Sequence, residues 1–275
     1  MGNSFLELTK QALDLINIDG DVVEVLPFGG GLINATFLVR TKLESGEERK
    51  YILQRINHYI FKDVEKLMNN YCRVCDYLKY IVAKSNGDVN RETITVVNAK
   101  DGRSFTKDLE GNYWRVIKFI PDTITYETIN CEDDFYKAGK AFGKFQNMLA
   151  DYNAELLYES IPNFHNTKER LKTFINAIKE NKSGRKDNAI DEINFILERQ
   201  GQASLLVDML ERGELPLRVT HNDTKISNVL IDKDTKEGIC VIDLDTIMQG
   251  LSLYDFGDAI RSGATFARED EEELS

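Results

Sequence analysis

The sequence predicts an α+β fold made of two lobes, the first rich in strands and the second mainly helical. Up to residue 120, β-branched and aromatic segments alternate with turns, whereas apolar residues recur at helical spacing beyond that point. Pro121 and Asp122 end the last early strand and form the expected hinge, so the lobes comprise residues 1–121 and 122–275. A chain of 275 residues is long enough for each lobe to bury its own core.

The first lobe is expected to contain an antiparallel five-stranded sheet and two helices. Helical spacing follows Ser4 and returns over residues 63–83, where apolar residues recur every three or four positions. Strand patterns occupy five segments, residues 22–26, 34–41, 50–56, 93–98 and 113–120. In the second lobe, helical spacing occupies residues 135–149, 167–180, 187–199 and 204–212.

Three consecutive glycines separate the first two strands. Gly29, Gly30 and Gly31 permit left-handed backbone and let N–H groups approach an anion closely, and Asn34 stands where a phosphate-covering loop has its last glycine. Taken alone, the glycines are equally typical of a hairpin turn. Together with the polar pattern later in the chain, they favour a loop that covers phosphates.

A hairpin late in the chain is the clearest feature of the sequence. Residues 228–231 and 239–242 are apolar and flank a charged turn, so they are expected to pair. Such pairing brings Asn228, at the entry of the hairpin, beside Asp243 at its exit. Amide and carboxylate oxygens suit a hard cation such as Mg²⁺, so these two residues are candidate metal ligands.

The loop before this hairpin carries the candidate catalytic residues. His221, Asp223 and Asn228 follow the pattern His-x-Asp-x-x-x-x-Asn, in which the Asp accepts a hydroxyl proton and the Asn holds metal. Lys225 is suited to offset negative charge on a transferred phosphoryl group. Taken singly, such residues are commonly turn signals and caps, but here they fall in register with the hairpin.

These motifs resemble the aminoglycoside phosphotransferase and choline kinase family, most of all its N-acetylhexosamine kinase group. The likeness rests on His221-Asn-Asp223, on Asn228, on Val-Ile-Asp243-Leu-Asp245 and on residues 250–261, Gly-Leu-Ser-Leu-Tyr-Asp-Phe-Gly-Asp-Ala-Ile-Arg. It covers most of the chain and implies a protein-kinase-like fold. It also implies ATP and Mg²⁺ as cofactors and transfer of the γ-phosphate to a small-molecule hydroxyl.

The resemblance assigns roles to the acidic residues that follow the hairpin. Asp243 is expected to hold the metal, with a water-mediated contribution from Asp245. Asp255-Phe-Gly spells the metal tripeptide of protein kinases but opens a helical pattern, so Asp255 is expected to brace the catalytic loop, as is His221. The alternative for Asp255 is a helix N-cap.

The nucleotide contacts are less defined. The third strand lacks the lysine that protein kinases direct at the α- and β-phosphates, so Gln54 or Arg55 is expected to replace it, whichever side chain faces the cleft. Glu65 is either the acid that pairs with this strand or a solvated residue at a helix start. The resemblance assigns the adenine edge to backbone groups of Lys118, Phe119 and Ile120.

The acceptor implied by the resemblance is an amino sugar, most of all the anomeric hydroxyl of an N-acetylhexosamine. His165 is expected either to line the sugar pocket or to pack beside Phe164, and Arg261 is expected to brace the site or to touch substrate. Two alternatives stay open: an aminoglycoside or choline-like acceptor, and a nucleotide-binding module without catalysis.

Composition and net charge exclude some classes of binding partner. A net charge of −11 disfavours nucleic acid and anionic membranes. No apolar run approaches the roughly 18 residues of a membrane helix, and four cysteines fit free thiols, so a cytoplasmic location is expected. The resembled kinases continue beyond the position of Ser275 with more helices, which implies that this chain is truncated after its acidic residues 268–275. The oligomeric state is not indicated.

Overall fold

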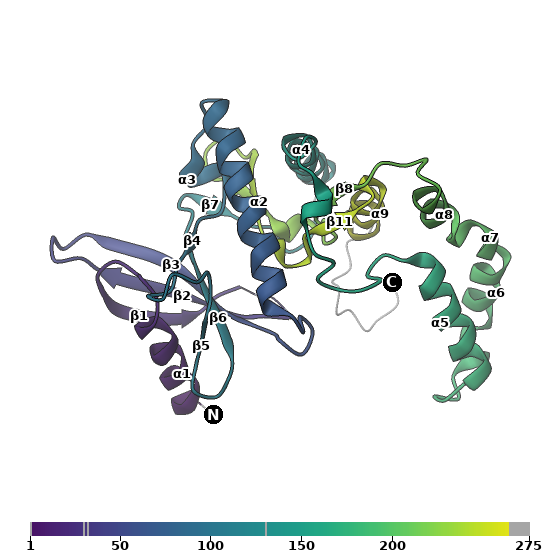
Figure 1. Cartoon of the computed structure of the whole chain (residues 1–275), viewed down its shortest axis with the longest axis horizontal. Helices are drawn as coiled ribbons and strands as arrows, with labels where there is room; N and C mark the ends of the chain where they lie inside the picture. The colour runs from purple at the N-terminus through teal and green to yellow at the C-terminus, as the bar shows by residue number, and fades with distance from the viewer. Residues whose placement is uncertain (1, 30, 32, 130, 264–275) are drawn as a thin grey trace.

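The computed structural model describes residues 2–29, 31, 33–129 and 131–263. Its first lobe is an antiparallel sheet with the strand order β1-β2-β3-β6-β4, to which a short strand β5 adds by pairing with β6 (Figure 1). Four of the predicted strands are confirmed over most of their length, the one predicted over residues 93–98 is reduced to the two-residue β4, and β5 is an addition too short to leave a pattern in the sequence. The strands are β1 (Asp21–Pro27), β2 (Ala35–Lys42), β3 (Glu48–Ile56), β4 (Val96–Val97), β5 (Thr106–Lys107) and β6 (Tyr113–Lys118).

Two helices cover opposite faces of this sheet. Helix α1 (Gly2–Asp14) shares an apolar cluster with side chains such as Leu53 and Trp114, which point to one face. Helix α2 (Val64–Lys84) lies on the other face, and Asp63 caps it by accepting the Lys66 N–H at 3.0 Å. Because successive side chains of a strand point to opposite faces, the neighbours Gln54 and Arg115 are directed away from α1.

Helix α2 also belongs to the core of the second lobe, because its buried face packs in one cluster with β9 (Val229–Asp232), β10 (Gly238–Val241) and α4 (Glu132–Met148). Asn70 of α2 donates to the carbonyl oxygens of Ile247 at 3.0 Å and Tyr158 at 2.8 Å. The hinge between the lobes is also held by hydrogen bonds from the first lobe. Arg91 of α3 (Val89–Glu92) donates to the carbonyl oxygens of Pro121 and Asp122, both at 3.3 Å, where the chain leaves β6.

The second lobe contains two small sheets, with the orders β10-β9-β7 and β11-β8. The predicted hairpin is confirmed as β9 and β10, which pair antiparallel with Val229 opposite Val241. Gly238 permits close packing on α4, since a Cβ there would lie 2.7 Å from the Cβ of Ala141. The strands are β7 (Thr123–Ile124), β8 (Arg218–Thr220), β9 (Val229–Asp232), β10 (Gly238–Val241) and β11 (Met248–Gly250).

Helices make up the remainder of the second lobe. Figure 1 shows α5 to α8 set apart from the sheets, whereas α4 and α9 lie beside them. Among the described residues, no helix has both the length and the apolar character needed to cross a membrane. The helices are α4 (Glu132–Met148), α5 (Thr167–Glu180), α6 (Ile190–Glu198), α7 (Gln200–Ala203), α8 (Leu205–Glu211) and α9 (Ser252–Gly263), with the 3₁₀ turns η1 (Ala154–Leu156), η2 (Lys186–Ala189), η3 (Ile226–Asn228) and η4 (Leu244–Thr246).

Candidate active site

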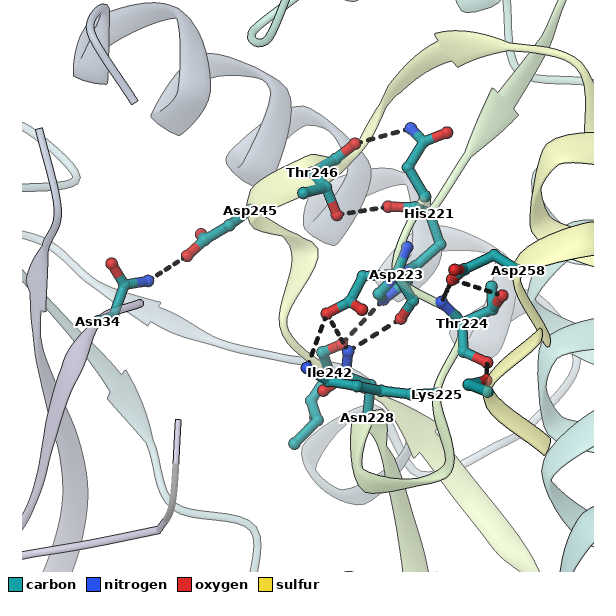
Figure 2. A network of polar contacts seen from close by, with 12 residues as sticks. Asn34, His221, Asp223, Thr224, Lys225, Asn228, Ile242, Asp245, Thr246 and Asp258 are labelled. Atoms are coloured by element: carbon teal, nitrogen blue, oxygen red, sulfur yellow. Dashed lines mark hydrogen bonds and ion pairs between the residues drawn. The ribbon is translucent and has the colours of Figure 1, made fainter. Parts of the chain in front are cut away.

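The candidate site is built on the loop between β8 and β9 (Figure 2). His221 is fully buried, with its Nε2 2.9 Å from the Ile242 carbonyl oxygen and its Nδ1 3.3 Å from the Asp223 backbone nitrogen. A ring nitrogen facing a carbonyl must donate, and one facing an N–H must accept, so these contacts define a neutral imidazole with its proton on Nε2. His221 thereby fixes the backbone of Asp223 against the exit of the hairpin.

Two carboxylates of α9 hold the same loop from another side. The buried Asp255 accepts the backbone N–H groups of His221 at 3.0 Å and Asn222 at 2.8 Å. Asp258 accepts the N–H of Thr224 at 2.6 Å and its hydroxyl at 3.2 Å (Figure 2). Three backbone N–H groups of the loop and the Thr224 hydroxyl are therefore bound by side chains more than thirty residues away in the sequence.

Asp255→Asn is expected to destabilise the protein by about 3 kcal/mol, because the amide replaces one of the two acceptor oxygens with a donor, and a buried unsatisfied donor costs about 1–3 kcal/mol. Gln146 of α4 also donates to this carboxylate, at 3.0 Å, so the change affects three donors. The measurement is the free energy of unfolding in urea. Asp234→Asn on the exposed tip of the hairpin is the matched control. Equal stability of the two variants would contradict the bracing role of Asp255.

Asp223 is oriented by two neighbours in the loop. Asn228 donates its side-chain N–H to Asp223 Oδ2 at 2.8 Å and to the Asp223 carbonyl oxygen at 2.9 Å. The Lys225 ammonium lies 3.3 Å from the same Oδ2. A carboxylate held in this way by an amide and an ammonium group has a defined direction. It can therefore accept a proton from a hydroxyl group within hydrogen-bond distance.

Asn228 and Asp243 provide the oxygens of a possible cation site. The amide nitrogen of Asn228 donates to Asp223, so the Asn228 Oδ1 is the atom that can bind a cation. Asp243 is half-buried at a left-handed φ of 61°, and its carboxylate forms no hydrogen bond or ion pair within the part of the chain that the structure describes. Burial and the carboxylates of Asp245 and Asp223 raise the pKa of Asp243 to about 6, against the opposing effect of Arg115.

This oxygen set fits a metal that arrives with a nucleotide. Among the described residues, no group of three or more His, Cys, Asp or Glu side chains is arranged to hold a metal by itself. Mg²⁺ is usually bound by one or two protein oxygens together with substrate phosphates and waters. The Asn228 amide oxygen and the Asp243 carboxylate match that requirement.

Asp245 differs from what the sequence predicts. Its carboxylate forms a two-pronged ion pair with the buried Arg115 of β6, in which Arg115 Nη2 lies 3.0 Å from Oδ2 and Nη1 donates to Oδ1. Asn34 donates to Oδ2 as well (Figure 2). Both oxygens are thus engaged within the protein. These contacts disfavour direct coordination of a metal by Asp245, and its water-mediated contribution stays a prediction.

A cleft of about 690 Å³ runs between the two lobes past these residues. This volume falls within the roughly 300–1,000 Å³ of typical small-molecule sites. Asn34 and Gln54 line it from the first lobe, and Asp223, Lys225 and Asp243 line it from the second. The proton acceptor Asp223 and the possible metal ligand Asp243 therefore open into the same cleft.

The glycine loop lies partly in this cleft. Gly31 lines it, Gly29 has the left-handed φ of 74° that favours glycine, and Gly30 lies outside the described residues. Asn34 does not continue the loop as a glycine substitute. Its Oδ1 accepts the Asn57 N–H at 2.9 Å while its Nδ2 binds Asp245, so it connects the two lobes directly.

The register of β3 decides between the two candidates of the third strand. Gln54 lines the cleft and accepts the Arg115 Nε–H at 2.9 Å, whereas Arg55, one residue later, is not among the residues that line it. Glu65 is exposed on the first turn of α2 and does not line the cleft either. The cation that faces α2 is Arg115, and its acidic partner is Asp245 instead of Glu65.

Part of the backbone at the hinge is engaged within the protein. The N–H of Lys118 donates to the Thr95 carbonyl oxygen at 2.8 Å, and that of Phe119 to the Lys50 carbonyl oxygen at 3.2 Å. The carbonyl oxygen of Ile120 accepts the Thr123 hydroxyl at 2.9 Å. The adenine edge assigned to this segment therefore stays a prediction, and it would use backbone groups other than the N–H groups of Lys118 and Phe119.

The two residues predicted for the acceptor both line the cleft. The ring of His165 lies 4.7 Å from that of Phe164 and 5.4 Å from that of Tyr254, measured between centroids. Arg261 donates to Asp258 Oδ1 through Nε at 3.2 Å and Nη2 at 3.1 Å. One end of the cleft therefore combines aromatic rings with an arginine–aspartate pair.

Sequence reasoning missed two residues of this arrangement, Arg115 and Asp258. A signal for Arg115 was present, since it interrupts the run from Trp114 to Ile117 in a strand with neighbours on both sides. A charged residue in a covered strand requires a buried partner. Asp258 follows Asp255 by three residues, which places both carboxylates on the same side of a helix.

A strand-rich lobe and a helical lobe that enclose an Asp-Asn-Asp arrangement define a protein-kinase-like phosphotransferase. The chain belongs to the Phosphotransferase enzyme family, whose model matches residues 24–274. The likeness to aminoglycoside phosphotransferases and choline-type kinases is thereby confirmed.

Solved structures with this fold include an amicoumacin kinase in complex with AMP-PNP and Ca²⁺, at 12% identity and a TM-score of 0.54, covering 94% of this chain and 69% of that one. An aminoglycoside phosphotransferase from Alicyclobacillus acidocaldarius matches at 12% identity and 0.53, covering 92% and 70%. An ethanolamine kinase from Plasmodium vivax matches at 17% and 0.50, covering 86% of this chain and 61% of its own length. At these identities the likeness concerns the fold.

Proposed function

We propose that this protein transfers the γ-phosphate of ATP to a hydroxyl group of a small polar acceptor, most of all the anomeric hydroxyl of an N-acetylhexosamine. The observation that carries the proposal is a group of three residues at one interlobe cleft, which Asp223 and Asp243 line and where Asn228 orients Asp223. These are Asp223 with its oriented carboxylate, Asn228 with its amide oxygen, and Asp243, whose carboxylate has no partner among the described residues.

Each of these groups has one role in the proposed reaction. Asp223 accepts the proton of the acceptor hydroxyl while the hydroxyl oxygen forms a bond to the γ-phosphorus. The bond between the γ-phosphorus and the oxygen that bridges it to the β-phosphate breaks, and ADP leaves. Asn228 and Asp243 would hold Mg²⁺, which would neutralise charge on the phosphates of the nucleotide when bound. Lys225, beside Asp223, offsets charge on the phosphoryl group in transit.

The charge of the cleft supports a neutral acceptor. A polycationic aminoglycoside requires carboxylates without partners, because charged groups across an interface must be complementary. Two of the carboxylates that line the cleft are already paired, Asp258 with Arg261 and Asp245 with Arg115. The aromatic rings at the same end of the cleft suit the apolar face of a sugar ring, and the polar groups around them suit its hydroxyls.

The test is ADP release with Mg·ATP across N-acetylhexosamines, hexoses, aminoglycosides and choline. We expect turnover with an N-acetylhexosamine and none with that acceptor in the Asp223→Asn variant. Turnover confined to aminoglycosides or choline would contradict the proposed acceptor. ATP binding without release of ADP for any acceptor would contradict phosphotransfer and favour a non-catalytic nucleotide-binding module.

A further inference from the structure

Arg115 stands out because it is a fully buried arginine in the middle of the first lobe's sheet. It lies on β6 directly opposite Gln54 of β3, and its exposed fraction is 0%. A buried guanidinium is retained only when all of its charge and donors are satisfied. The contacts of Arg115 therefore indicate what it is there to hold.

Every side of the guanidinium is occupied. Its Nε donates to Gln54 at 2.9 Å, and its plane lies over the ring of Tyr71 of α2, 4.4 Å from the centroid. Its two terminal nitrogens bind the two oxygens of Asp245, which is itself 4% exposed. Two parallel hydrogen bonds fix both the distance and the direction of the carboxylate, which a single contact does not.

Asp245 is in the same 3₁₀ turn that follows the possible metal ligand Asp243. The other end of this turn is held by the catalytic loop. Thr246 donates its hydroxyl to the His221 carbonyl oxygen at 2.6 Å and accepts from Asn222 Nδ2 at 2.8 Å (Figure 2). The turn is therefore clamped between the first lobe and the catalytic loop, and Asp243 stands at its start.

We propose that Arg115 is a positioning residue that sets the Asp243 carboxylate beside Asn228 by holding Asp245. It makes the metal-binding geometry depend on how the first lobe is seated on the second. One expectation from the sequence is an ion pair between a cation of the third strand and Glu65 of α2. The pair of Arg115 with Asp245 takes its place, because the residue of β3 that lines the cleft is Gln54 and Glu65 is exposed. The inference rests on the proposed function only in that Asp243 binds the metal of a nucleotide.

The test removes both charges together, as Arg115→Met/Asp245→Leu. Removing only one partner leaves an unpaired buried charge, which strongly destabilises the folded state. Replacing both partners with apolar residues of similar volume is often neutral for stability. We expect a folded protein whose thermal midpoint falls only modestly, because Gln54 and Asn34 each lose one partner. The Mg²⁺ concentration required for half-maximal binding of AMP-PNP is expected to rise at least tenfold, with no change in affinity in EDTA. Arg115→Lys, which keeps the charge without the two-pronged geometry, is expected to fall between the two.

The matched control is another ion pair between the lobes, Lys144 with Glu92 at 2.7 Å, removed as Lys144→Met/Glu92→Gln. It connects α4 to α3 without touching the turn after Asp243, so its Mg²⁺ dependence is expected to stay at the wild-type level. A wild-type Mg²⁺ dependence in Arg115→Met/Asp245→Leu would overturn the positioning role.

A second measurement separates this inference from the proposed function. Hydrogen exchange of the free protein reports on the turn without any nucleotide, through amides such as Ile247 N–H, which donates to Leu244 at 3.2 Å. Faster exchange at residues 244–247 in Arg115→Met/Asp245→Leu than in the control supports the clamp. Equal exchange in both proteins overturns it, even if neither protein binds nucleotide.

Discussion

Asp223→Asn is expected to lower the rate of phosphotransfer by about 10²–10⁴-fold, the usual contribution of a general base. The amide keeps the size of the side chain and can still contact Asn228, but it cannot accept the hydroxyl proton. Because Asp223 is assigned no contact with metal, the affinity for Mg·ATP should stay nearly unchanged. The measurements are turnover by ADP release and binding by titration calorimetry on the same preparation.

The control for this variant is Asp151→Asn, the same chemical change on an exposed turn. Wild-type turnover in Asp223→Asn would remove Asp223 from the mechanism. A loss of ATP affinity together with turnover would indicate that Asp223 contacts the nucleotide instead of the acceptor. The two readouts therefore separate proton acceptance from nucleotide binding.

The sequence predicts the parts of the site that depend on local pattern. Two apolar segments around a charged turn were sufficient to predict the β9–β10 hairpin, and the hairpin alone brings Asn228 towards Asp243. The choice between Gln54 and Arg55 was different, because a shift of one residue in strand register exchanges the two faces. Only the observed pairing of Gln54 with Arg115 decides which of them reaches the cleft.

Contacts between distant segments were beyond prediction for a physical reason. Arg115 and Asp245 are 130 residues apart, so the position of Arg115 within an apolar strand indicates a buried partner but not which acidic residue that partner is. The resemblance assigned Asp245 a water-mediated contribution to the metal site, and its local sequence does not indicate the ion pair with Arg115. At the hinge, the engaged N–H groups of Lys118 and Phe119 result from backbone pairing, which leaves no trace in side-chain identity.

Asp243→Ala is expected to weaken binding of Mg·ATP by roughly 100-fold, about 2.7 kcal/mol, because it removes the only carboxylate assigned to the metal. Binding of ATP in EDTA should be unchanged or slightly stronger, since a negative charge facing the phosphates is removed. Titration calorimetry with AMP-PNP, with and without Mg²⁺, distinguishes these effects. Wild-type affinity with Mg²⁺ would contradict the metal assignment.

A second substitution, Asp243→Asn, is expected to stabilise the free protein while it weakens metal binding. Asparagine tolerates the left-handed φ of 61° at this position, whereas alanine is strained there. Asp243 is half-buried near Asp245 and Asp223, and no cation of the described chain pairs with it. Burial and these two carboxylates raise its pKa to about 6, so above that pH the charged carboxylate disfavours the folded state, and its removal should raise the thermal midpoint without nucleotide. An unchanged or lower midpoint of Asp243→Asn above that pH would contradict a cost of Asp243 to the fold.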